Sequence, residues 1–75
     1  MSVQEYAEKA DMIVAGYAYL VQEGFIEVVD LNDLTKHAII QNGDVVESLM
    51  SDEEDDIILK YYHRNKAVLE ASINA

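Results

Sequence analysis

The stretch SDEEDDIILKYY, residues 51–62, runs five consecutive acids directly into an apolar and aromatic pattern. Ser51 with Glu54 three residues later is a capping box, in which each side chain satisfies a backbone amide that the first helical turn leaves unpaired. The pattern predicts one amphipathic helix from Asp52 to about Asn74. Its apolar side falls within less than half of the helix circumference and consists of Ile57, Ile58, Tyr61, Tyr62, Val68, Leu69 and Ile73.

The acids at the start of this predicted helix exceed what the helix end needs. Carboxylates in a first turn interact with unpaired amides and with the positive end of the helix dipole, each contributing about 0.3 to 1 kcal/mol. Two or three acids supply that stabilisation, whereas five adjacent acids repel each other and point in all directions around the helix axis. Two interpretations stay open: a solvated helix start that adds solubility, and a docking site for a basic surface of another protein. The docking residues would be Asp52, Glu53, Asp55 and Asp56.

A divalent-metal site is a third interpretation of the acid run, because carboxylate oxygens suit Ca²⁺ and Mg²⁺. Neither the run nor residues 30–41 follow the calcium-loop pattern, since Thr35 stands where that loop needs glycine and Gln41 where it needs glutamate. His37 and His63 fall on different predicted elements, and there is no cysteine to complete a zinc site. We therefore predict no metal ligands and no cofactor.

A hairpin is predicted in the middle of the chain, where Asn42-Gly43 lies between two runs of β-branched residues. Asn-Gly is a preferred pair for a two-residue turn in which both φ angles are positive. A tight turn places Ile40 opposite Val45 and Ile39 opposite Val46. The sequence therefore predicts two antiparallel strands joined at this turn.

The residues before the hairpin add a further strand and one open question. Residues 25–31 are rich in β-branched and aromatic types and predict a strand, which Asn32 and Asp33 end with turn chemistry. For residues 33–41 the alternative to a strand is a short helix, capped by Asn32 and ended by the Asn-Gly pair.

The first segment, residues 2–23, predicts a helix. Ser2 and Glu5 form a second capping box, and Gly24 follows as a helix stop. Apolar residues recur at alternating steps of four and three, and further apolar residues project from the opposite side, so the second half of this helix is apolar nearly all round. Two interpretations of that opposite side stay open: an interface between two copies of the chain, as a homodimer, and edge positions of a larger core that Met12 and Tyr19 would cover. The interface residues would be Met12, Gly16 and Tyr19.

Together these elements predict an α+β fold in the order α-β-β-β-α, with two helices packed on a three-stranded antiparallel meander. The chain has 75 residues and forms a single small domain, residues 1–75. A chain of this length buries only about 60 to 65 per cent of its unfolded surface, which leaves little room for an enclosed active-site cavity.

The charge of the chain constrains its partners. Fifteen acidic residues oppose five basic ones, for a net charge of −10, which disfavours direct contact with nucleic acid or anionic lipid and favours a basic protein. No apolar run approaches the roughly 18 residues of a membrane span, and residues 2–8 carry acids where a secretory signal needs bases. With no cysteine in the chain, we expect a cytoplasmic protein that does not engage a membrane.

No set of serine, histidine and acidic residues matches a nucleophile or acid–base motif, so the sequence predicts a protein that is not an enzyme. The hypothesis it favours is an acidic protein–protein interaction module that binds a basic surface of another protein. One version of this hypothesis is an inhibitor or nucleic-acid mimic that occupies a basic groove. The alternatives are a structural homo-oligomer with no charged partner and a small regulator that responds to a divalent metal.

Overall fold

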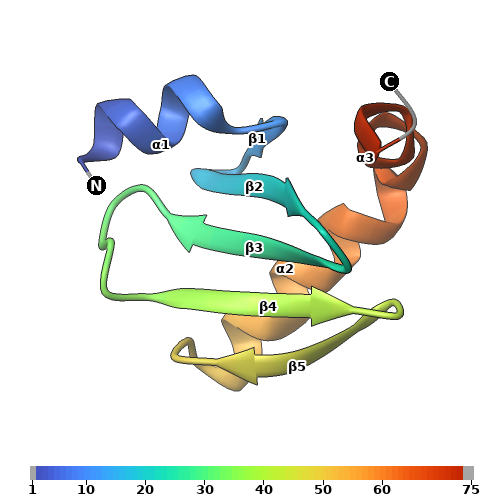
Figure 1. Cartoon of the computed structure of the whole chain (residues 1–75). Coiled ribbons are helices and arrows are strands. Elements are labelled where there is room, and N and C mark those ends of the chain that lie inside the picture. Colours follow the sequence, from blue (N-terminus) through green and yellow to red (C-terminus); the bar gives the residue numbers. More distant parts are fainter. Residues whose placement is uncertain (1, 74–75) are drawn as a thin grey trace.

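The structure is a computed structural model that describes residues 2–73, including the side chains of residues 2–70. The helices are α1 (Val3–Lys9), α2 (Asp52–Arg64) and α3 (Lys66–Ile73). The strands are β1 (Met12–Val14), β2 (Tyr17–Gln22), β3 (Phe25–Asp30), β4 (His37–Gln41) and β5 (Asp44–Ser48). They form one five-stranded sheet in the order β1-β2-β3-β4-β5, with each strand antiparallel to the next (Figure 1). The domain is α+β, but the predicted three-stranded meander with two helices is wrong.

The error lies in the N-terminal segment, where the predicted helix over residues 2–23 ends at Lys9. Its capping box is present, because Ser2 Oγ accepts a hydrogen bond from the Glu5 N–H at 3.2 Å. The residues that follow form β1 and β2, and residues 17–20 of β2 are all buried. A short apolar run that is covered on both sides fits a central strand as well as a helix. The all-round apolar character therefore reflects burial on both faces of the sheet.

Two-residue turns join β1 to β2 and β4 to β5. The predicted Asn42-Gly43 turn is confirmed, with φ angles of 54° and 82°, and Ile40 lies opposite Val45. The register beyond that pair differs from the prediction, because an irregularity between Ile39 and Ile40 places Ile39 opposite Glu47 instead of Val46. An extra residue of this kind in one strand is a β-bulge, which adds local twist and bends the strand.

The short helix considered for residues 33–41 does not form. The Asp33 carboxylate accepts hydrogen bonds from the Thr35 N–H at 3.1 Å and from the Thr35 hydroxyl at 2.6 Å. These bonds fix a turn, as short polar side chains do when they bond to the backbone two residues on. The Asp30 N–H also donates to the Lys36 carbonyl at 3.0 Å, so the chain reverses and enters β4 at His37.

The predicted C-terminal helix divides into α2 and α3 at Asn65. The backbone there leaves the helical region, with φ −115° and ψ 17°, and the Asn65 side-chain amide donates to the Tyr61 carbonyl at 2.9 Å. An asparagine side chain that bonds a nearby backbone carbonyl in this way competes with helix continuation. The predicted start is confirmed, because Ser51 caps α2. The predicted end at about Asn74 lies outside the described residues.

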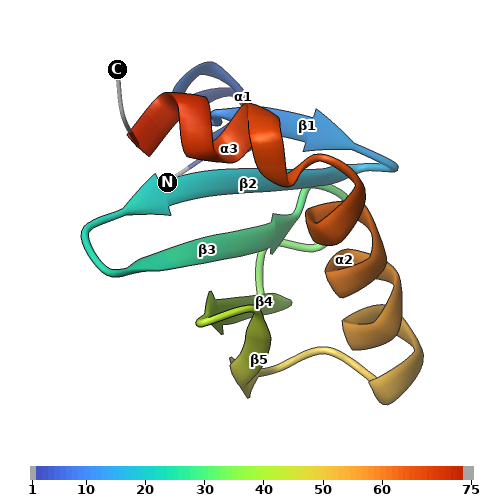
Figure 2. The ribbon, with the colours of Figure 1, turned by 90° about the vertical axis from the view of Figure 1, so that its right-hand side faces the viewer.

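The sheet has an apolar layer on each side. We call the side under α2 and α3 the helical face and the opposite side the open face (Figure 2). The buried core of the helical face consists of Tyr17, Tyr19, Ile26, Val28, Ala38, Ile40, Ile58, Tyr62 and Leu69. The smaller cluster on the open face consists of Ala18, Leu20 and Val29, with Tyr6, Ala10, Leu31 and Leu34 packed against it. The first helix, α1, thus packs on the open face mainly at β2.

Candidate functional site

Glu54, in the first turn of α2, is an internal residue of the fold. Its carboxylate accepts hydrogen bonds from Lys36 Nζ at 3.2 Å and from the Tyr17 hydroxyl at 3.3 Å, and only 18% of its side chain is exposed. The Lys36 ammonium holds the pKa of the Glu54 carboxyl below its usual value, and the same bond raises the pKa of Lys36. Glu54 therefore connects the start of α2 to β2 and to the turn before β4.

Asp55 also faces the rest of the domain. It is half-buried, and its carboxylate accepts a hydrogen bond from the Ser48 hydroxyl at 2.5 Å. Ser48 Oγ in turn accepts from the Met50 N–H at 2.9 Å, which shapes the link between β5 and α2. Asp55, which the sequence placed in the docking set, thus has a partner inside the fold.

The other three acids of the run point away from the domain. We call Asp52, Glu53 and Asp56 the outer acids; all three are exposed. Among the described side chains, residues 2–70, no ion pair or side-chain hydrogen bond engages them. Ile57, the residue that follows Asp56 on α2, is 40% exposed. The surplus of carboxylates is therefore on the surface, on the same helix as an exposed apolar side chain.

A second feature is the uncovered part of the open face, formed by β3, β4 and β5. Because Ile26 and Val28 belong to the core of the helical face, the alternation of a strand directs Phe25 and Glu27 to the open face. Ile39 faces the same way, with Glu27 directly opposite on one neighbouring strand and Glu47 opposite on the other. An apolar side chain thus lies between two carboxylates in one row across the sheet.

Leu49 continues this surface beyond the end of β5. Its N–H donates to the His37 carbonyl at 2.9 Å, which prolongs the ladder by one residue. A shallow groove of about 340 Å³ beside it is lined by His37, Glu47, Ser48 and Leu49. We call Phe25, Glu27, Ile39, Glu47 and Leu49 the open patch. No lysine or arginine occurs on β3, β4 or β5, so the patch is apolar and acidic.

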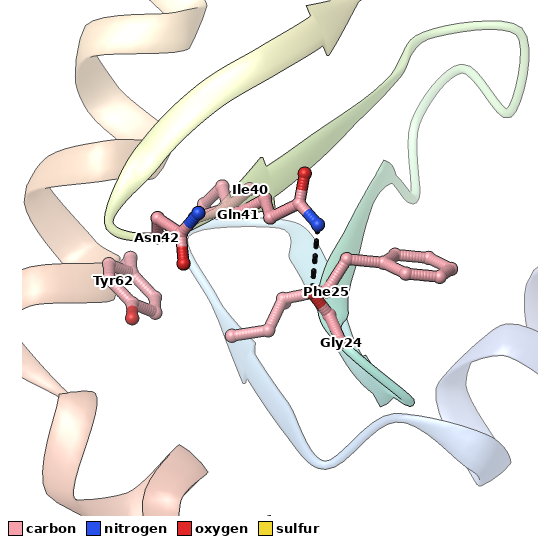
Figure 3. Close-up of a pocket in the computed structure, with 7 residues that line it drawn as sticks. Gly24, Phe25, Ile40, Gln41, Asn42 and Tyr62 are labelled. Atoms are coloured by element: carbon pink, nitrogen blue, oxygen red, sulfur yellow. Dashed lines mark hydrogen bonds between the residues drawn. The ribbon is translucent and has the colours of Figure 1, made fainter.

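A second hollow, of about 250 Å³, lies where the β2–β3 and β4–β5 turns approach α2 (Figure 3). Gln41 Nε2 donates to the Gly24 carbonyl at 3.3 Å across it, and Tyr62 of α2 lines its other side, while the Phe25 ring points away. The groups that line it are amides, a phenol and aliphatic side chains. None of them is a carboxylate or an imidazole, so this hollow offers contact area and hydrogen bonds but no acid–base pair.

The three residues predicted for an oligomer interface do not share a surface. Tyr19 is fully buried, and its hydroxyl donates to the Ile58 carbonyl of α2 at 2.6 Å. Burial raises the pKa of this hydroxyl. Met12 is half-buried against the same core, and Gly16 forms the β1–β2 turn. These three residues would share a side only in the predicted helix, which does not form here. Because Tyr19 is buried, a partner cannot reach it.

Neither histidine lies in a cluster of metal ligands. His37 is half-buried in β4, and His63 is exposed on α2, where its ring meets the edge of Tyr62 at a centroid distance of 5.1 Å. In the part of the chain that the structure describes, no group of three or more histidine and acidic side chains is placed to hold a metal ion. The acid run therefore has no additional ligand from elsewhere in the described fold.

Sequence reasoning missed the internal partners of the acid run. Lys36 lies 18 residues before Glu54, and Ser48 lies seven before Asp55, on elements that meet α2 only in the folded chain. The spacing carries no local signal for either contact. The sequence offered one hint, because Lys36 is the only lysine or arginine between residues 25 and 50. It is therefore the expected ion-pair partner for a half-buried acid that meets this segment.

The fold and this surface define a small α+β domain with a five-stranded antiparallel meander and an acidic exterior. The chain belongs to the family described as "Family of unknown function (DUF7723)", which matches residues 1–69. No curated protein and no solved structure matches the chain. Along the described residues, no helix has the length and apolar character needed to cross a bilayer.

Proposed function

We propose that this protein is a non-enzymatic acidic interaction module that binds a basic surface of another protein through the outer acids of α2. One observation carries the proposal: of the five acids in the run, the fold engages Glu54 and Asp55 and leaves the outer acids exposed. Carboxylates that repel each other and have no internal partner gain most from an external cation. Asp55 is left out of the docking set because it bonds Ser48.

The overall charge supports the same partner type. At −10 the molecule attracts basic surfaces over roughly a Debye length, about 8 to 10 Å at moderate salt. Exposed charges at the rim of an interface act mainly on the association rate and on its salt dependence. We place the module in the cytoplasm, and one form of the proposal is an inhibitor that occupies a nucleic-acid-binding groove of its partner.

The test is affinity capture of a partner with three forms of the full chain, from a lysate of the organism that carries it. The test variant is Asp52→Asn/Glu53→Gln/Asp56→Asn. The control, Glu8→Gln/Glu23→Gln/Asp44→Asn, removes the same number of exposed acids from other elements. We expect wild type and control to retain the same basic protein and the test variant to retain about tenfold less at low salt.

The salt dependence completes this experiment. Raising the salt from about 50 to 300 mM shortens the screening length by more than half, so binding of wild type and control should weaken while residual binding of the test variant changes little. The proposal is abandoned if the test variant and the wild type capture the same partners in equal amounts at both salt concentrations.

Self-association is a second candidate function, favoured by the charge order along the outer side of α2. The outer acids lie in its first half, Lys60 and Arg64 are exposed in its second half, and Ile57 is exposed between them. Two copies of α2 packed antiparallel would bring opposite charges together across a two-fold axis. Sedimentation equilibrium of wild type and Ile57→Lys separates the two candidates, because only a homodimer loses mass on this substitution.

A further inference from the structure

We infer that the open patch on β3, β4 and β5 is the docking surface for a basic amphipathic helix of the partner protein. This inference uses the proposed function only for the sign of the partner's charge. It concerns a different face of the molecule from the outer acids.

Helices cover the two faces of the sheet unequally. Five strands at about 4.8 Å spacing span about 19 Å, whereas one helix with its side chains is about 10 to 12 Å wide. Two helices, α2 and α3, cover the helical face (Figure 2), whereas the open face carries one helix, α1, together with Leu31 and Leu34 of the β3–β4 connection, packed on Ala18, Leu20 and Val29. The sheet beside α1, over β3 to β5, therefore has room for one more helix (Figure 1).

The uncovered strands carry apolar side chains on the open face. Phe25 is 37% exposed and Leu49 65% exposed, and Ile39 between them in the sheet is only half-buried. A sheet face that contacts only solvent normally carries polar residues at such positions. Covering the three side chains removes apolar surface from water, which favours an apolar stripe on the occupant.

The charges of the open patch lie on both sides of its apolar centre. Glu27 and Glu47 flank Ile39 from the two neighbouring strands, so their backbones are about 10 Å apart, close to the width of a helix. A helix seated with its apolar stripe on Ile39 would place the residues on its two flanks above these carboxylates. Lysine or arginine on both flanks is the complementary pattern. A second copy of this face is disfavoured because it would set glutamate against glutamate.

The probe is a synthetic peptide of about 18 residues, about 27 Å as a helix, with leucines at helical spacing and lysines on both flanks. Its control replaces every lysine by glutamate. Amide shifts of the ¹⁵N-labelled full chain locate the site, and calorimetry measures the affinity. We expect the lysine peptide to shift the amides of β3, β4 and β5 and the glutamate peptide to shift none.

Two variants of the open patch test the contacts separately. Glu27→Gln/Glu47→Gln removes the flanking charges, and Leu49→Ser removes exposed apolar area; each should weaken the lysine peptide about fivefold or more. Leu49 lies outside the core and Glu47 is exposed, and unchanged amide dispersion of each variant confirms the fold. The matched control, the triple variant of the outer acids, should bind the peptide within about twofold of wild type.

The outcomes distinguish the inference from the proposed function. If the peptide shifts only α2 and the outer-acid variant alone weakens it, the open patch is not the site, and the acidic module still stands. If no shift occurs on β3 to β5, the inference is overturned whatever partner is captured. If the open-patch variants lose the peptide and the captured partner while the outer-acid variant keeps both, the inference holds and the assignment to α2 fails.

Discussion

Ala15 and Asn42 occupy equivalent positions in two turns of the sheet, and the substitution Ala15→Asn should stabilise the protein. Ala15 and Gly16 have φ angles of 54° and 83°, and Asn42 and Gly43 have 54° and 82°. Each pair closes a hairpin between directly paired residues. The two backbones thus require the same left-handed conformation at the first position, which asparagine adopts more readily than alanine.

The magnitude follows from the cost of the left-handed region. A residue with a Cβ atom loses roughly 1 to 2 kcal/mol there, and asparagine recovers part of it through its local hydrogen bonds. We expect Ala15→Asn to raise the free energy of unfolding by about 0.5 to 1 kcal/mol, which corresponds to about 2 to 8 °C in Tm for a domain of this size. Asn42→Ala should lower it by a similar amount.

Urea and thermal unfolding, followed by circular dichroism, measure both variants and their combination. Strands β2 and β4 run in the same direction, so the turn before β2 and the turn after β4 lie at opposite ends of the sheet. Distant substitutions add, and the double variant should return to within about 0.5 kcal/mol of wild type. The reasoning fails if Ala15→Asn lowers Tm, or if the two single variants change Tm in the same direction.

Three further predictions concern the buried contacts and the first turn. Tyr19→Phe removes the hydroxyl that donates to the Ile58 carbonyl and should cost about 1 kcal/mol in urea unfolding; an unchanged midpoint would show that this bond is energetically neutral. Lys36 lowers the pKa of the Glu54 carboxyl in the folded protein below 4.5, the usual pKa of a glutamate. Wild type should therefore be more stable than Glu54→Gln above pH 4.5, and this advantage should disappear as the pH falls through the lower pKa of the folded state. A pH-independent difference between the two would contradict the ion pair. Gly16→Ala, at φ +83°, should cost about 1 to 2 kcal/mol. The cost should exceed that of Gly24→Ala, because an added Cβ would lie 3.3 Å from the Asn32 side-chain amide at Gly16 and would meet nothing within 4 Å at Gly24. A smaller cost at Gly16 than at Gly24 would argue against this crowding.

Local chemistry made parts of the fold predictable. The Asn42-Gly43 pair marks its turn because few other dipeptides tolerate two positive φ angles, and Ser2 and Ser51 mark helix starts because their hydroxyls accept from amides three residues on. Ala15-Gly16 makes the same turn as Asn42-Gly43 but carries a weaker signal, since alanine favours helices. Apolar residues at steps of three and four around it then fitted a helix equally well.

The sequence alone predicted that the candidate site is rich in carboxylates, but not which of them are free. The run of acids showed that carboxylates exceed the needs of a helix start, but which of them are surplus depends on Lys36 and Ser48, which approach α2 only after the chain folds. The open patch was less visible still. Its row of Glu27, Ile39 and Glu47 depends on strand order and on the bulge, which moves Glu47 rather than Val46 opposite Ile39.

The start of α2 presents acids both to the sheet and to solvent because consecutive residues on a helix point in directions about 100° apart. Glu54 and Asp55 are adjacent and face the sheet, where they bond Lys36 and Ser48. The outer acids precede or follow them and necessarily face outward. Substitutions at the inner pair should therefore change stability more than substitutions at the outer acids, which remove only the helix-dipole interaction of Asp52 and Glu53 and should alter partner binding. Removing outer acids from a chain of net charge −10 also relieves repulsion, which offsets part of that loss. The unfolding midpoint of the triple variant therefore separates a loss of binding from a loss of stability.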